Sequence, residues 1–308
     1  MSWQAVTTQP CELGESPFWH PQEHMLYWVD IPGKKILRTG GAAGTTDIWP
    51  MAAPHALEPG CIAPARHGGL VIALRDGIYR ARAWGSELQL LVPFAHDTTT
   101  TRFNDGKCDP LGRFWAGTMY EPRDARRAAL FSVDCRHGGV PLVELKADNA
   151  IIANGLAWSA DRKTVYWSDT PNHIIRAWSW DEASNVMSAP RVFHQFPAKP
   201  PGWHYGVAGY GGRPDGAAVD VQGNYFVAMF EGRRLLKLSP GGEILADIPT
   251  PTQCPTMPCF GGDDLKTLYL TTARHKRSAE ELADMPLSGC VFSMRVEVPG
   301  LPVNFFSD

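Results

Sequence analysis

Four residues with carboxylate or amide side chains recur at similar distances before short apolar runs of this 308-residue sequence. They are Glu15, 11 residues before Leu26; Asn104, 8 before Gly112; Asn154, 10 before Thr164; and Asp215, 8 before Gly223. Two carboxylates and two amides form an oxygen-rich set of donors. Such a set suits a hard divalent cation, such as calcium, magnesium or manganese, better than a metal that prefers thiolates. An incomplete shell of these ligands would leave room for water and a substrate.

Three of these positions also read as good turn sequences: Asn104-Asp105-Gly106, Asn154-Gly155 and Asp215-Gly216. Each of them, taken singly, has a simple turn as its alternative interpretation. The shared spacing favours a common site, because ordinary hairpin turns would occur at every corner of a repeating unit. In two further units the comparable positions fall near Gly60 and Thr256.

The elements that must position these side chains form a repeat. Short runs rich in aromatic and branched residues begin at Leu26, Gly69, Gly112, Thr164, Gly223 and Thr267, at intervals of 43, 43, 52, 59 and 44 residues. Most are followed by a second strand-like segment, and units of this length with several short strands are typical of propeller blades. The sequence therefore predicts an all-β, six-bladed β-propeller, a single domain over residues 1–308. Two β-sandwiches are the alternative, but the spacing never resets and no linker divides the chain.

In a ring of blades, equivalent positions in the repeat lie at equivalent radial positions. We therefore expect the four polar side chains to converge at one mouth of the central channel and to form a metal site there. Arg102 lies two residues before Asn104 and is a candidate clamp for an anion or a carbonyl group, with a solvated loop arginine as the alternative.

Composition excludes several classes of partner. Lys and Arg number 29 against 32 Asp and Glu, so there is no basic excess for a nucleic acid or a membrane surface. We find no apolar run of about 18 residues and no export signal, which predicts a cytoplasmic protein without a membrane span. Seven scattered cysteines without a C-x-x-C pair are typical of reduced thiols. No G-x-S-x-G elbow, P-loop or strand-anchored G-x-G-x-x-G occurs.

Two insertions lengthen the repeat. Residues 197–214 are rich in proline and glycine, with Trp203, His204 and Tyr205 among them. This stretch is either a structured loop that overhangs a site or a simple connection. Residues 278–283 begin with a Ser-x-x-Glu capping box and predict a short helix.

Several motifs together resemble the gluconolactonase/regucalcin (senescence marker protein) family of six-bladed propellers, over nearly the whole chain. They are Leu13-Gly14-Glu15-Ser16-Pro17, Trp28-Val29-Asp30-Ile31, Arg102-Phe103-Asn104-Asp105-Gly106-Lys107, Ala116-Gly117-Thr118-Met119, Asn154-Gly155-Leu156-Ala157-Trp158-Ser159 and Pro214-Asp215-Gly216. One departure concerns the segment after Thr118-Met119. Regucalcin-like members have two adjacent acidic residues there, the second of which touches the substrate, whereas this chain has Tyr120-Glu121-Pro122.

The resemblance implies one divalent ion (calcium, zinc, manganese or magnesium) held by Glu15, Asn154 and Asp215. It also implies substrate contacts from Arg102 and Asn104, with Glu121 as a candidate third contact and a substrate preference that differs accordingly. The implied activity is hydrolysis of a sugar-acid lactone, an aldonolactone or an aldarolactone, in carbohydrate catabolism. In that reaction Asp215 is the candidate general base.

Two other functions stay open. One is a calcium-binding propeller without catalysis, and the other is an arylesterase-like propeller hydrolase.

Overall fold

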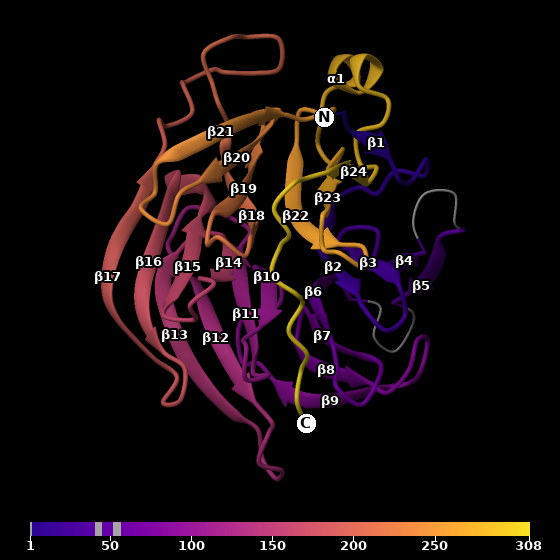
Figure 1. Cartoon of the computed structure of the whole chain (residues 1–308), viewed down its shortest axis with the longest axis vertical. Coiled ribbons are helices and arrows are strands. Elements are labelled where there is room, and N and C mark those ends of the chain that lie inside the picture. Colours follow the sequence, from indigo (N-terminus) through magenta and orange to yellow (C-terminus); the bar gives the residue numbers. More distant parts are fainter. Residues whose placement is uncertain (1, 41–44, 52–56) are drawn as a thin grey trace.

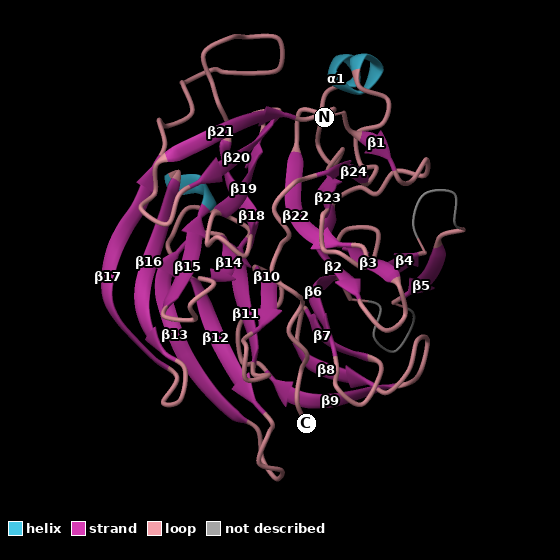
Figure 2. Ribbon diagram, in the orientation of Figure 1, coloured by secondary structure: helices cyan, strands magenta, loops and turns pink. Residues whose placement is uncertain are grey.

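The computed structural model describes residues 2–40, 45–51 and 57–308. Within these residues the strands form six four-stranded antiparallel sheets, which stand around a ring like the blades of a propeller (Figure 1). The all-β, six-bladed β-propeller predicted from the repeat is confirmed, and the alternative of two sandwiches is wrong. Figure 2 shows how little of the described chain is helical.

The strands follow one another blade by blade. Blade 1 holds β2 (Gly14–His20), β3 (Met25–Asp30), β4 (Lys35–Thr39) and β5 (Asp47–Pro50). Blade 2 holds β6 (Pro59–Pro64), β7 (Leu70–Leu74), β8 (Gly77–Ala81) and β9 (Leu88–Pro93). Blade 3 holds β10 (Thr101–Cys108), β11 (Phe114–Tyr120), β12 (Ala128–Asp134) and β13 (Leu142–Ala150).

The second half of the chain repeats the pattern. Blade 4 holds β14 (Ala153–Trp158), β15 (Thr164–Asp169), β16 (Ile174–Asp181) and β17 (Val186–Gln195), with a short 3-10 turn η1 (Thr170–Asn172). Blade 5 holds β18 (Arg213–Val219), β19 (Tyr225–Phe230), β20 (Arg234–Leu238) and β21 (Ile244–Pro249). Blade 6 holds β22 (Pro255–Gly261), β23 (Thr267–Thr272), β24 (Phe292–Arg295) and the N-terminal β1 (Gln4–Ala5).

The apolar runs that revealed the repeat are the second strands of the blades, β3, β7, β11, β15, β19 and β23. These strands are almost wholly buried, because each blade packs both of its faces against its neighbours. The predicted short helix is α1 (Ala279–Asp284), and its N-cap Ser278 accepts a hydrogen bond from the backbone N–H of Glu281 at 3.2 Å.

Two segments join distant blades. Strand β1 pairs with β24, with Gln4 opposite Ser293, so the last blade is completed from the start of the chain. The segment after β24 crosses the ring in Figure 1. There the backbone of Leu301 donates to Val219 of blade 5 at 2.9 Å, and Phe306 donates to Pro64 of blade 2 at 2.8 Å.

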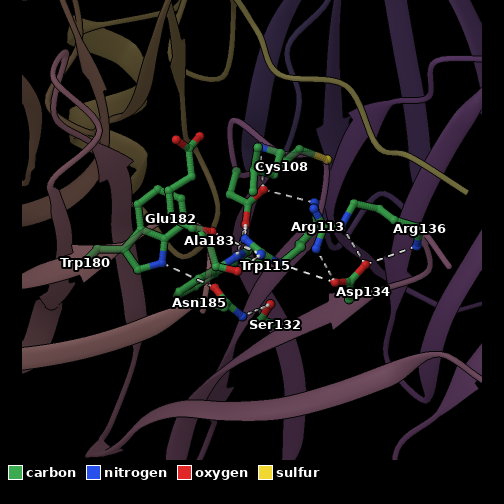
Figure 3. A network of polar contacts seen from close by, with 12 residues as sticks. Cys108, Arg113, Trp115, Ser132, Asp134, Arg136, Trp180, Glu182, Ala183 and Asn185 are labelled. Carbon is green, nitrogen blue, oxygen red and sulfur yellow. Dashed lines mark hydrogen bonds and ion pairs between the residues drawn. The ribbon is translucent and has the colours of Figure 1, made fainter.

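Polar groups reinforce the interface between blades 3 and 4, as Figure 3 shows. Arg113 pairs with Asp109 at 2.9 Å and with Asp134 at 3.4 Å, and it donates to the carbonyl of Glu182 in the next blade at 3.1 Å. Beside it the indole N–H of Trp115 donates to Asp109 at 3.0 Å. The bond from Arg113 to Glu182 joins blade 3 to blade 4, and both blades carry residues of the predicted site.

All seven cysteines are free thiols, as the scattered spacing predicts. No helix in residues 2–40, 45–51 and 57–308 has the length and apolarity that a bilayer crossing requires.

Candidate active site

The four phased residues all lie on the innermost strands, Glu15 on β2, Asn104 on β10, Asn154 on β14 and Asp215 on β18. At each of them the pairing with the second strand is irregular, with register shifts that begin at Glu15, Phe103, Asn154 and Pro214. A β-bulge turns side chains away from the regular alternation of a strand. The turn alternative is therefore wrong, because these sequences form bulged strands.

In at least two blades, the bulge contains a residue whose backbone has a positive φ, in the left-handed region. Gly155 has φ +61°, and a Cβ there would lie 2.4 Å from both Ser168 Oγ and Tyr225 Oη. In blade 1 Ser16 has φ +50°. The side chain of Tyr225 donates to the Gly155 carbonyl at 2.7 Å and so holds this bulge in place. Only glycine fits at position 155 without displacing its neighbours.

One cavity of about 580 Å³ lies at the mouth of the channel on this side. Its walls include every residue predicted from the sequence: Glu15, Arg102, Asn104, Glu121, Asn154 and Asp215. All of them except Glu121 are buried, so the alternative of a solvated Arg102 is wrong. The structure thus brings together side chains that are up to two hundred residues apart in the sequence.

Asn104 is the centre of the hydrogen bonding at the base of the cavity. Its Nδ2 donates to Asn154 Oδ1 at 2.8 Å and to the Ala153 carbonyl at 2.9 Å, while its Oδ1 accepts from Arg102 Nη1 at 2.8 Å. Both amide hydrogens are therefore used inside the protein. A second lone pair on Asn104 Oδ1 stays available, so toward a sugar this residue is an acceptor of hydroxyl hydrogens.

The hydrogen bond made by the side-chain nitrogen of Asn154 determines the orientation of its amide group. Its Nδ2 donates to Thr170 Oγ1 at 2.8 Å, and that hydroxyl donates to the carbonyl of Pro214 at 2.8 Å. The Asn154 oxygen consequently faces Asn104 and the cavity rather than Thr170. The same chain of bonds ties Asn154 to the residue that precedes Asp215.

Three carboxylates lie buried together at the base. Burial, followed by the negative charges of Asp215 and Asp105, raises the pKa of Glu15 well above its ordinary value. Burial and the charge of Asp105 do the same to the pKa of Asp215. Asp105 accepts a hydrogen bond from the Leu156 N–H at 3.0 Å through Oδ2, but its buried Oδ1 has no partner among the described residues. The base of the cavity is therefore a strongly negative environment that a cation would stabilise.

This donor set fits a hard cation. No three His, Cys, Asp or Glu side chains in the described ranges are grouped as metal ligands. The expected set, however, consists of two carboxylates and the amide oxygen of Asn154, so it contains only two residues of those types. Clustered carboxylates with raised pKa values and an oriented amide oxygen are the oxygen ligands that calcium, magnesium and manganese prefer.

One wall of the cavity carries a balanced set of charges. Arg75 donates to Glu58 at 2.9 Å and to Glu121 at 2.9 Å, and Arg102 Nε lies 3.8 Å from Glu121. Glu121 is thus held between two arginines at the rim. Neither Arg75 nor Glu58 was predicted from the sequence.

The opposite wall contains a group of charged residues that were not predicted from the sequence either. The carboxylate of Glu231 is buried and accepts from Lys199 at 2.9 Å and from Arg277 at 2.9 Å, while Arg213 lies 3.4 Å away. Lys199 and Arg213 stand at the two ends of the 197–214 insertion and line the cavity. The insertion is therefore a loop that reaches the site, as one of its two interpretations expected.

A simple signal could have found many of these residues. The residue directly after each second strand lines the cavity: Ile31, Arg75, Glu121, Thr170, Glu231 and Ala273. Counting forward from the repeat, as well as backward, would have placed all six at the mouth of the channel.

A family model matches residues 13–274 of the chain and describes the SMP-30/gluconolactonase/LRE-like region. The chain belongs to this family. The match spans all four phased residues and the three motifs expected to supply metal ligands.

Among the relatives of this SMP-30/gluconolactonase/LRE-like protein is a 6-deoxy-6-sulfogluconolactonase of Pseudomonas putida, 42% identical, with 99% of this chain and 98% of the relative aligned. A regucalcin of Danio rerio is 33% identical over 97% of this chain and 96% of its own length. A solved structure described as a calcium-binding regucalcin from Agrobacterium tumefaciens superposes with a TM-score of 0.87, covering 99% of this chain and 97% of that one, at 22% identity. At that identity the superposition shows the shared fold.

Proposed function

We propose that the protein is a metal-dependent lactonase that opens the ring of a sugar-acid lactone, an aldonolactone or an aldarolactone, to the free acid. The observation that carries the proposal is the cavity at the channel mouth, where buried carboxylates, an oriented amide and a buried arginine face one space. Membership of a family with named lactonases supports the same reaction.

Glu15, Asn154 and Asp215 would hold the metal ion. When bound, a divalent ion supplies positive charge that stabilises the oxyanion formed as water adds to a lactone carbonyl. It also favours the ionised forms of Glu15 and Asp215, which burial alone disfavours. Calcium, magnesium, manganese and zinc are the candidate ions.

The protein's own residues supply proton transfer and orientation. Asp215 accepts the proton of the attacking water at a carboxylate oxygen and returns it to the ring oxygen as the ring C–O bond breaks, which leaves an alcohol and the free acid. Asn104 Oδ1 accepts from a sugar hydroxyl. Arg102, rigidly placed by its bonds to Asn104 and the Phe103 carbonyl, donates to the substrate from its remaining N–H groups.

A pH-stat assay tests the proposal with glucono-1,5-lactone, galactono-1,4-lactone and an aldaric lactone, before and after removal of metal with a chelator. We expect acid release that stops in the chelated protein and returns with added calcium, magnesium, manganese or zinc. Phenyl acetate serves as a comparison substrate for an arylesterase.

Two outcomes contradict the proposal. A protein that binds calcium and gains thermal stability but opens no lactone is a calcium-binding propeller. A protein that cleaves phenyl acetate faster than any sugar lactone is an arylesterase.

A further inference from the structure

The cavity walls differ in charge. On the side of blades 2 and 3, two arginines face two glutamates at contact distance. The rest of the lining contains a cationic wall, defined here as Arg123, which follows β11 of blade 3, together with Lys199, Arg213 and Arg277, around the carboxylate of Glu231. Arg277 has a second partner, Glu281, at 2.7 Å. Among the described residues, the cationic wall keeps an excess of positive charge.

Two members of the cationic wall, Arg123 and Arg213, have side-chain N–H groups without a hydrogen-bond partner among the described residues. Lys199 and Arg277 are occupied by glutamates at 2.7–3.0 Å. Arg213 makes no side-chain hydrogen bond within the described residues, since its Nη2 lies 3.4 Å from Glu231 and its guanidinium rests 5.1 Å from the centre of the Phe230 ring. Arg123, at the exposed mouth, has neither a hydrogen bond nor an ion pair with any described side chain.

Arg123 and Arg213 line the same cavity. Partial burial, and then the positive charge of Arg213, lower the pKa of the Arg123 guanidinium, and the charges of Glu231 and Glu121 oppose this shift. Two arginines that repel each other across a cavity, with free N–H groups, are stabilised by an anion between them. The excess positive charge of the cationic wall would persist with a metal ion bound, because the charge of a divalent ion balances the two carboxylates of Glu15 and Asp215 at the base.

We propose that Arg123 and Arg213 bind an anionic group at the far end of the substrate. The substrate class is then a sugar lactone whose terminal carbon carries a sulfonate, a phosphate or a carboxylate. This inference rests on the proposed function, since it places the lactone ring at the base of the cavity and the anion against the cationic wall. Bidentate bonds from guanidinium groups suit all three anions.

Binding of the open-chain acids tests the subsite without any need for turnover. Isothermal calorimetry would compare gluconate with 6-phosphogluconate, glucarate and 6-deoxy-6-sulfogluconate. We expect at least one of the three acids with a terminal anion to bind tenfold or more tightly than gluconate, and the ranking of the three identifies the anion. The preference should decrease as salt rises from 20 to 300 mM, about the range over which exposed charges become screened.

Variants locate the subsite. Arg123→Gln and Arg213→Gln should each reduce the preference for the terminal anion at least threefold, and the double variant at least tenfold. The matched control is Arg191→Gln, which removes an exposed arginine from the outermost strand β17. Arg123 is exposed, so its variant tests the proposal even if Arg213→Gln fails to fold.

Equal binding of gluconate and all three acids would overturn the inference, as would a preference that survives the double variant. In the pH-stat assay, the ratio of kcat/KM for lactones with and without the anion should fall with the double variant in the same way. If the protein opens neutral lactones with no preference for a terminal anion, the proposed function stands and this inference is wrong. If the protein prefers the terminal anion in calorimetry but opens no lactone, the subsite stands and the proposed function is wrong.

Discussion

Asn104 Nδ2 donates a hydrogen bond of 2.8 Å to Asn154 Oδ1, across 50 residues of sequence and from one blade to the next. The bond joins an expected substrate contact to an expected metal ligand. It leaves the remaining lone pair of the Asn154 oxygen for a ligand, while Thr170 holds the amide nitrogen on the opposite side. Binding of the substrate and binding of the ion thus depend on one pair of amides.

Replacing Asn104 with aspartate tests this dependence. Asn104→Asp has nearly the same shape but cannot donate to Asn154, so the two oxygens would repel and Asn154 would turn. We expect divalent-ion affinity to fall by about 10–100-fold, as for other residues that orient a ligand. Calorimetric titration of the metal-free protein with calcium or manganese measures it. Unchanged affinity in a folded Asn104→Asp protein would show that the bond does not position the ligand.

Asp215→Asn should remove most of the turnover and leave the fold intact. The amide keeps an oxygen in the same place but cannot take the proton of water, so we expect kcat to fall by about 10²–10⁴-fold. Circular dichroism and the pH-stat assay measure fold and rate. Asp148→Asn, which changes an exposed residue of β13, is the matched control. Wild-type rates in Asp215→Asn, with metal present, would refute the role of Asp215.

Gly155→Ala should destabilise the protein far more than the same substitution at a glycine with a similar φ. The new Cβ would lie 2.4 Å from Ser168 Oγ and Tyr225 Oη in a left-handed residue, and we expect a loss of about 3 kcal/mol or more. The matched control is Gly202→Ala, where φ is +71° but nothing lies within 4 Å, and the expected loss is about 1 kcal/mol. Urea unfolding measures both. Equal losses would mean that the backbone angle, rather than the close packing of the bulge, determines the residue.

The salt bridge of Asp134 predicts a stability effect that depends on pH. Hydrogen bonds from Arg136 come first among the causes that lower the pKa of Asp134 from 3.8 to about 2. Because the folded pKa lies below the unfolded one, the stabilisation is present above pH 4 and is lost as the pH falls toward 2. Asp134→Asn should therefore lower the unfolding free energy by about 1–2 kcal/mol at pH 7.

The difference in unfolding free energy between wild type and Asp134→Asn, measured by urea titration, should become smaller between pH 5 and pH 3. Asp148→Asn, at an exposed position, should behave as wild type over the same range. If the difference in unfolding free energy stays constant down to pH 3, the ionised carboxylate of Asp134 does not stabilise the protein through Arg136 and Arg113.

The sequence predicted the architecture well because the repeat is visible in the second strands, which are rich in aromatic and branched residues and buried along nearly their whole length. It also predicted the inner-strand oxygens, since Glu15, Asn104, Asn154 and Asp215 occupy one position in that repeat. The turn-like dipeptides Asn154-Gly155 and Asp215-Gly216 were ambiguous, because a glycine after a polar residue suits a hairpin turn and a bulge equally.

The missed residues had weaker signals. Glu231 and Arg75 are single charges at strand ends, where surface charges are common. Glu231 is buried and Arg75 is partly buried, and each pairs with a residue of another blade, Glu231 with Arg277 and Arg75 with Glu121. No local pattern contains that information. Asp105 was read as part of a turn, although its buried carboxylate accepts a hydrogen bond from the backbone N–H of Leu156 in the next blade.

The pairing of β1 with β24 has a consequence for how the protein is made. A ribosome makes the N-terminal side of a chain first, so blades 1 to 5 can form before β24, the strand that pairs with residues 4 and 5, has been synthesised. The cavity draws side chains from the first blade and the last, so it exists only once that seam has closed. A molecule that contacts residues of both blades in the cavity opposes reopening of the ring, because its binding energy is lost when the blades separate.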